Sequence, residues 1–243
     1  MGRPEYPGEH PAQREVAISR PVAVTIDGPS GAGKSVVGRL LAQRLGYTFV
    51  DTGAMYRAVT WLALQRGLNP ADETALARLA EQARIRITRP SVEDGRAYSV
   101  FLDDQDITWA IRGSDVERLV SVVSSISGVR EALVAQQRVM GKSGGIVMVG
   151  RDIGTVVLPQ AELKIYLTAS PGERARRRFL ELVARGEEVD QARLHEEMVR
   201  RDRIDSERAH SPLRPAEDAH VVDTEDRTVD EVVMEIDRLL PVI

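Results

Sequence analysis

Short apolar runs alternate along the chain with segments whose apolar positions recur at helical spacing. The apolar runs lie at residues 22–26, 47–51, 146–149, 163–168 and 220–224. The helical segments lie at residues 34–45, 54–65, 114–127, 129–140, 171–185, 190–203 and 228–240, with a break expected at Gly128. Ser170 with Glu173, and Thr228 with Glu231, form capping boxes that predict where two helices begin. Strands that alternate with amphipathic helices predict an α/β fold with a parallel sheet.

Residues 84–108 follow a different pattern, because apolar and polar positions alternate there with period two. Asp94-Gly95 lies within this stretch and predicts a hairpin turn between two strands. The stretch therefore predicts a small antiparallel β insert in the α/β fold.

Composition and charge limit the classes of protein that the chain can represent. With 243 residues, 42% of them hydrophobic, the chain can form one large domain or one domain with an insert. The net charge of −4 argues weakly against nucleic-acid and membrane partners, and the absence of cysteine excludes thiol catalysis. No apolar run approaches the ~20 residues of a membrane span, and no apolar interface helix is evident, so we expect a cytoplasmic monomer. Pro4, Pro7 and Pro11 predict that residues 1–20 form a flexible tail.

The sequence "VTIDGPSGAGKSVVGRL" has the spacing and context of a phosphate-binding loop, with a strand before it and a helix after it. Its backbone N–H groups and the helix N-terminus would face phosphate oxygens. Lys34 would reach the β- and γ-phosphates, and the Ser35 hydroxyl would bind Mg²⁺. The predicted ATP-binding loop consists of Gly28, Pro29, Ser30, Gly31, Ala32, Gly33, Lys34 and Ser35.

Residues that follow the predicted strands indicate a kinase for a small phosphorylated molecule. The chain has no Asn-Lys-x-Asp guanine motif, which argues against a GTPase. Thr52 and Arg57 follow the second strand, and Arg151 and Asp152 follow the fourth. Ligands of such sheets bind beyond the carboxyl ends of the strands, and arginine grips phosphate bidentately. A sugar or shikimate acceptor would need fewer arginines.

Six motifs together resemble those of the bacterial cytidylate (CMP) kinases, over about residues 22–240. They are "IDGPSGAGKS", "DTGAMYR", "VREALVAQQR", "GRDIGTVVLP", "RRDRIDSER" and "SPLRPAEDAHVVDT". The resemblance implies the three-layer P-loop fold of nucleoside monophosphate (NMP) kinases, with a parallel five-stranded core sheet, the small antiparallel insert and a helical lid. The implied core comprises residues 21–83, 141–169 and 205–243, the NMP-binding insert about 84–140, and the lid about 170–204.

The resemblance further implies transfer of the γ-phosphoryl group of ATP to CMP or dCMP, with Mg²⁺. By their positions in the motifs, Ser121, Arg130 and Asp152 would contact cytosine. A carboxylate suits the N4 amino group, and an arginine suits the ring acceptors. The positions that would hold the acceptor phosphate are Thr52, Arg57, Arg151 and Arg208. Those near the sugar are Arg201 and Asp205.

Arg174, Arg177 and Arg178 would share one face of a helix, because they are three and four residues apart. The resemblance places this helix in the lid, where Arg174 and Arg178 would act with Lys34 on the transferring phosphoryl group and Arg177 would bind ATP. The alternative is a solvated face balanced by acidic neighbours. Those neighbours are Glu173 and Glu181.

One departure from the family concerns the metal site. Many relatives place aspartate directly before the Gly-Arg-Asp motif, but this chain has Val149. Asp27 could serve the water shell of the metal instead, or could be a structural carboxylate at a strand end. Two other functions compete with a cytidylate kinase: another small-molecule kinase, of uridylate/cytidylate or shikimate type, and a nucleotide-binding regulatory module without transferase activity.

Overall fold

The computed structural model describes residues 22–184, 186–208 and 211–241, and the expected tail at residues 1–20 lies outside them. A five-stranded sheet forms the centre of the molecule, and all its neighbouring strands pair in parallel. In spatial order its strands are β2 (Thr48–Asp51), β6 (Ile146–Val149), β1 (Ala23–Asp27), β7 (Leu163–Thr168) and β8 (His220–Asp223). The predicted α/β fold with a five-stranded parallel core is confirmed.

Helices cover both faces of this sheet, as the alternation of side chains along β6 demonstrates. Val147 and Val149 pack with α1 (Lys34–Leu45) and α8 (Val229–Leu239). Ile146 and Met148 pack on the opposite face, which the short π-helical segment η2 (Ile153–Val157) and the helix α5 (Ser127–Gly141) cover. Since successive side chains of a strand point to opposite faces, both faces of β6 are buried in apolar surroundings.

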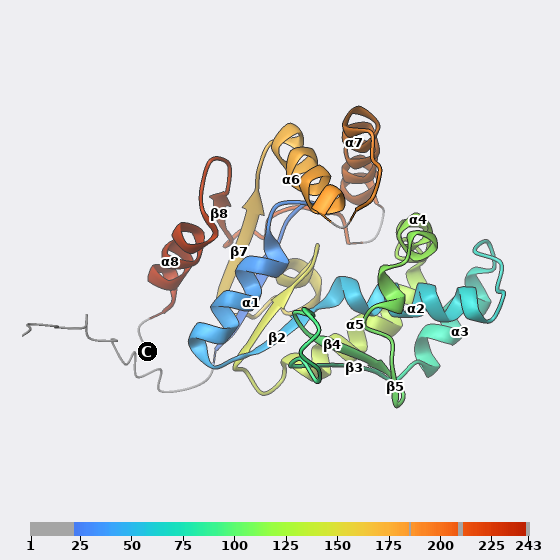
Figure 1. Cartoon of the computed structure of the whole chain (residues 1–243). Helices are drawn as coiled ribbons and strands as arrows, with labels where there is room; N and C mark the ends of the chain where they lie inside the picture. The colour runs from blue at the N-terminus through green and yellow to red at the C-terminus, as the bar shows by residue number, and fades with distance from the viewer. Residues whose placement is uncertain (1–21, 185, 209–210, 242–243) are drawn as a thin grey trace, which may run out of the picture.

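A second apolar core lies beside the sheet and is built by the insert together with α2 (Thr52–Gln65), α3 (Glu73–Gln82), η1 (Ala110–Arg112), α4 (Ser114–Val123) and α5. Two further helices, α6 (Pro171–Ala184) and α7 (Gln191–Glu207), lie outside this core. The sequence pattern had indicated neither α3 nor η2. Figure 1 shows α6 and α7 side by side above the sheet, with α4 facing them.

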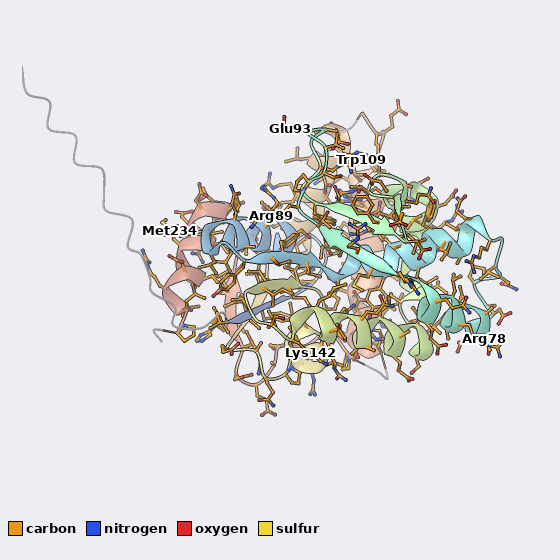
Figure 2. All side chains as sticks on the ribbon, turned by 90° about the horizontal axis from the view of Figure 1, so that it is seen from below. Arg78, Arg89, Glu93, Trp109, Lys142 and Met234 are labelled. Carbon is orange, nitrogen blue, oxygen red and sulfur yellow. The ribbon has the colours of Figure 1, made fainter. Side chains whose placement is uncertain are left out.

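The insert is a three-stranded antiparallel sheet, formed by β3 (Ile85–Thr88), β4 (Ser99–Leu102) and β5 (Gln105–Asp106). The hairpin turn expected at Asp94-Gly95 is not a tight turn, because both residues lie within a longer connection between β3 and β4. Asp94 accepts hydrogen bonds from Arg96 and, at 2.7 Å, from Nε1 of Trp109. Figure 2 labels Trp109 and Glu93 close together, on the upper side of the molecule in that view.

Two expected helix boundaries differ from the structure. Gly128 does not break a helix but lies in the first turn of α5, where an added Cβ would meet Cβ of Ala77 at 2.6 Å. Ser170 accepts the N–H of Glu173 at 3.3 Å, but its own N–H is bonded by Glu225 rather than by Glu173. The expected reciprocal box is therefore wrong at α6.

The second expected capping box is present at the start of α8. Thr228 and Glu231 each accept the backbone N–H of the other. Local sequence therefore decides this helix start, whereas a distant residue completes the start of α6.

No single helix of the described residues is long and apolar enough to cross a membrane; α4 and α5 reach the required length and composition together, but they meet at 99°. The molecule is elongated, and Figure 2 shows Arg78 on α3 and Met234 on α8 at its opposite ends. The division into core, insert and lid at the residue limits given above remains a prediction.

Candidate active site

The glycine-rich loop between β1 and α1 has the geometry of an anion-binding site. Gly31 and Gly33 adopt φ of 78° and 88°, in the left-handed region that favours glycine. A Cβ at Gly28 would clash with the carbonyl oxygen of Leu167. Gly33 is the N-cap of α1 and provides no side-chain hydrogen bond. The first N–H groups of α1 are therefore available to a phosphate.

Lys34 is buried, and its side chain folds back onto the glycine-rich loop. Its Nζ donates to the carbonyl oxygen of Pro29 at 2.6 Å. Burial, followed by the charge of Arg151, lowers the pKa of Lys34 well below its usual value. A phosphate bound at the loop would raise the pKa of Lys34 again, because its negative charge would pair with both Lys34 and Arg151.

A buried carboxylate lies beside the hydroxyl of Ser35. Oδ2 of Asp51, at the end of β2, accepts hydrogen bonds from Ser35 Oγ at 3.0 Å and from the Tyr98 hydroxyl at 2.9 Å. Arg57 lies 3.7 Å from the same oxygen. Burial opposes ionisation of Asp51, but Arg57 and the two hydrogen bonds hold its pKa below the usual value. Asp51 and Tyr98 are not among the site residues predicted from the sequence, although Asp51 is the first residue of the "DTGAMYR" motif.

Asp27, the other candidate for the metal's water shell, has a structural environment. Its two carboxylate oxygens accept the backbone N–H groups of Ile153 at 2.8 Å and Gly154 at 2.7 Å. Burial raises the pKa of Asp27 to about 6, against these two hydrogen bonds. The structure therefore favours the strand-end interpretation over the metal one.

A buried ion pair joins Arg130 of α5 to Asp152, just beyond β6. Each side chain is only 5% exposed. Arg130 also donates to the carbonyl oxygen of Ser124 at 3.2 Å, and its guanidinium lies 5.4 Å from the ring centroid of Tyr56. Ser121 lies one turn before Ser124, on α4. The structure thus brings Arg130 and Asp152 into direct contact and places Ser121 on the adjoining helix.

Further arginines surround Asp205, near the end of α7. Nε of Arg151 donates to Asp205 Oδ2 at 2.9 Å, and Nη1 of Arg151 donates to the Gly28 carbonyl oxygen at 3.1 Å. Arg208 lies 3.7 Å from Asp205. Burial, followed by the charge of Arg151, lowers the pKa of Arg201 to about 10.

Several guanidinium nitrogens of this group have no partner. Within the described residues, the buried atoms Arg130 Nε, Arg201 Nε, Arg208 Nε and Arg208 Nη2 make no hydrogen bond. Buried polar groups are normally paired, and an unpaired one costs ~1–3 kcal/mol. Unpaired cationic donors at the carboxyl end of a parallel sheet suit an anionic ligand.

Thr52 is the first residue of α2 and is buried behind this group. Its hydroxyl donates to the carbonyl oxygen of Val149 at 2.9 Å. To bind a phosphate oxygen, the hydroxyl would have to turn its proton from Val149 to the phosphate.

Arg174, Arg177 and Arg178, the three arginines of α6 that were expected to act on ATP, each have an acidic partner in this structure. Arg174 is buried, donates to the Ser30 carbonyl oxygen at 3.0 Å and pairs with Asp202 at 2.6 Å. Arg177 donates to the Thr224 carbonyl oxygen at 2.6 Å. Arg177 also pairs with Glu173, at 2.7 Å.

The third of these arginines links two parts of the molecule that are distant in sequence. Arg178 pairs with Glu181 on its own helix at 2.8 Å, and with Glu117 of α4 at 2.6 Å. Acidic side chains thus pair with these arginines, and one of the ion pairs joins α6 to α4. The roles of the three arginines remain a prediction.

The sheet order, the phosphate-binding loop and the neighbouring arginines define a P-loop kinase of the nucleoside monophosphate kinase type. A family model described as cytidylate kinase matches residues 24–241. A "Cytidylate kinase" of Pelotomaculum thermopropionicum is 51% identical over 210 residues, which cover 86% of this chain and 92% of that one. The chain belongs to the cytidylate kinase family.

Two further comparisons describe a longer relative and a shared fold. A "Bifunctional pantoate ligase/cytidylate kinase" of Synechococcus elongatus is 50% identical over 221 residues, which cover 90% of this chain but 42% of that protein. A crystal structure of an uncharacterized protein from Eubacterium ventriosum superposes with a TM-score of 0.50 at 10% identity, covering 90% of this chain and 98% of that chain. This second likeness concerns the fold alone.

Proposed function

We propose that the protein transfers the γ-phosphoryl group of ATP to CMP or dCMP, giving CDP or dCDP and ADP. The observation that carries the proposal is the set of buried, unpaired guanidinium N–H groups beside the Arg130–Asp152 pair. A nucleoside monophosphate supplies a phosphate for the cations and a base for the ion pair. Membership of the cytidylate kinase family supports this acceptor and does not favour the uridylate/cytidylate, shikimate or regulatory alternatives.

Cytosine recognition would use Asp152 and Ser121 for the N4 amino group and Arg130 for the ring acceptors. Uracil presents a carbonyl in place of the N4 amino group, so an ionised Asp152 would repel it. One well-placed contact of this kind discriminates by about 1–3 kcal/mol. Arg201 and Asp205 would lie near the sugar.

Phosphoryl transfer needs positioning and charge neutralisation more than proton transfer. An oxygen of the acceptor phosphate, held by Thr52, Arg57, Arg151 and Arg208, attacks the γ-phosphorus of ATP. The bond from that phosphorus to the bridging oxygen breaks, and ADP leaves. Lys34, Arg174 and Arg178 would neutralise the transferring group, while Arg177 and the loop would hold ATP. Closure of the insert and lid would exclude water.

Ser35 fits the expected Mg²⁺, because its hydroxyl is a hard oxygen donor in the first turn of α1 and has a carboxylate beside it. The described residues contain no cluster of three or more acidic or histidine side chains suited to a metal ion, so the nucleotide phosphates would complete the coordination. Bound there, Mg²⁺ would neutralise charge on the phosphates. We also propose a cytoplasmic monomer without nucleic-acid or membrane partners, which sedimentation of the purified protein would test for the oligomeric state.

The experiment that tests this function is ADP release from Mg·ATP with CMP, dCMP, UMP, AMP or shikimate offered separately. We expect fast turnover with CMP and dCMP and little with the others. Equal turnover of UMP would remove the role of Asp152 in reading N4. ATP binding without turnover on any acceptor would leave only the regulatory module.

A further inference from the structure

A carboxylate for the hydroxyl of Ser35 could come from the last residue of one of three neighbouring strands. These strands, β1, β2 and β6, end in Asp27, Asp51 and Val149. P-loop enzymes hold Mg²⁺ between the serine or threonine of the loop and a strand-end aspartate. The question is which residue fills that place in this chain.

Neither β1 nor β6 ends in a carboxylate that is free to bind Ser35. Asp27 accepts a backbone N–H group on each oxygen and so holds η2 against the sheet. Val149 is buried hydrocarbon that packs against α1, where a Cβ added to Gly38 would lie 2.6 Å from Val149 Cγ1. The carboxylate that contacts the hydroxyl of Ser35 therefore comes from neither β1 nor β6.

The carboxylate comes from the next strand along the sheet. Asp51 on β2 is the register partner of Val149 on β6, one strand further from β1. Its Oδ2 accepts the hydrogen bond of Ser35 Oγ at 3.0 Å. With the hydroxyl proton directed at Asp51, the lone pairs of Ser35 are left for a cation.

The carboxylate of Asp51 is held from several sides. The Tyr98 hydroxyl donates to Oδ2 from the insert, and Arg57 lies 3.7 Å from the same oxygen. Asp51 is the N-cap of α2, yet its side chain does not cap that helix. The carboxylate of Asp51 thus contacts Ser35 of the loop and accepts no capping hydrogen bond from α2.

We propose that Asp51 is the positioning residue for Mg²⁺, acting through the hydroxyl of Ser35 in place of an aspartate at position 149. The proposal rests on the proposed function, since it requires a Mg·nucleotide at the loop. It also ties the metal site to the acceptor side, because Tyr98 and Arg57 contact the same carboxylate.

The test measures binding of ADP by calorimetry to the full chain, once with excess Mg²⁺ and once with EDTA. For Asp51→Asn we expect the dissociation constant with Mg²⁺ to rise about 10-fold to 100-fold, as when other partners of metal ligands are removed. The constant in EDTA should stay the same or fall, because a negative charge near the phosphates has gone. Ser35→Ala should also raise the dissociation constant with Mg²⁺ and leave the constant in EDTA unchanged. The double variant should bind ADP with Mg²⁺ only a little more weakly than either single variant.

Each other outcome has a distinct meaning. An equal rise in both buffers, or no change in either, would show a merely structural Asp51 and overturn the inference. A wild type that binds ADP equally well in both buffers would overturn it too, but would leave nucleotide binding intact. Failure of the wild type to bind ADP in either buffer would instead refute the proposed function. Loss of folded protein lowers the stoichiometry and leaves the ratio of the two constants readable.

Discussion

Replacing Asp152 with asparagine tests whether the buried ion pair reads the base or only stabilises the fold. The substitution keeps the shape of the side chain and removes its charge. Arg130 then faces a neutral amide while 5% exposed. Removing one partner of a buried ion pair typically costs about 3–5 kcal/mol. We expect a value near the lower limit, because Arg130 keeps its bond to Ser124 and its contact with the ring of Tyr56.

The effect on specificity follows from the base. Asparagine can donate to the carbonyl oxygen of uracil as well as accept from the amino group of cytosine. The variant therefore lacks the repulsion between carboxylate and carbonyl that disfavours UMP. One contact is worth about 1–3 kcal/mol, and 1.36 kcal/mol is tenfold in rate. The ratio of kcat/KM for CMP to that for UMP should therefore fall about 5-fold to 150-fold.

Steady-state kinetics with both acceptors, at a temperature where the variant is folded, measures this ratio. Asp205→Asn is the matched control, because its expected contact is with the sugar, which CMP and UMP share. That control should lower both values of kcat/KM together. An unchanged ratio in Asp152→Asn, with both values reduced, would refute the reasoning and leave Asp152 a structural residue.

Three further predictions concern other parts of the molecule. Glu117→Gln frees Arg178 from a partly exposed pair, so KM for ATP should fall by up to about 5-fold; a rise in KM would contradict this. Thr228→Ala removes the capping box with Glu231 and should lower the free energy of unfolding in urea by about 1 kcal/mol at unchanged kcat. Burial raises the pKa of Asp27 from 3.8 to about 6, so its protonated form gives stability that is complete below pH 3.8 and is lost as the pH rises through 6. Asp27→Asn should remove this slope from the pH dependence of the free energy of unfolding.

Local patterns predicted those parts of the fold that neighbouring residues decide. The glycine-rich loop, the five parallel strands and the Thr228 capping box follow from short stretches of sequence, and all are present. The helix α3 also carried a local signal, since Leu76, Leu79 and Ala80 lie on one face and Asp72 caps it. That signal was missed rather than absent.

Other features depend on residues that are distant in sequence. The segment η2 is held by Asp27, more than a hundred residues earlier, through the N–H groups of Ile153 and Gly154. Glu225 completes the start of α6 in the same way, by accepting the N–H of Ser170. No local period reports such partners, so the sequence could nominate the residues of the site but not their pairing.

The pairing itself bears on how the proposed ligands would bind. In this structure Arg151 and Arg174, which are expected to contact phosphate, are each paired with a carboxylate, so a phosphate would exchange one anionic partner for another at these two residues. Such exchange lowers the free-energy cost of keeping arginines buried before the ligand arrives. Asp205, released from Arg151 by the exchange, would be free for the hydroxyl of the sugar. Recognition of the phosphate and recognition of the sugar would then be coupled through the same ion pair.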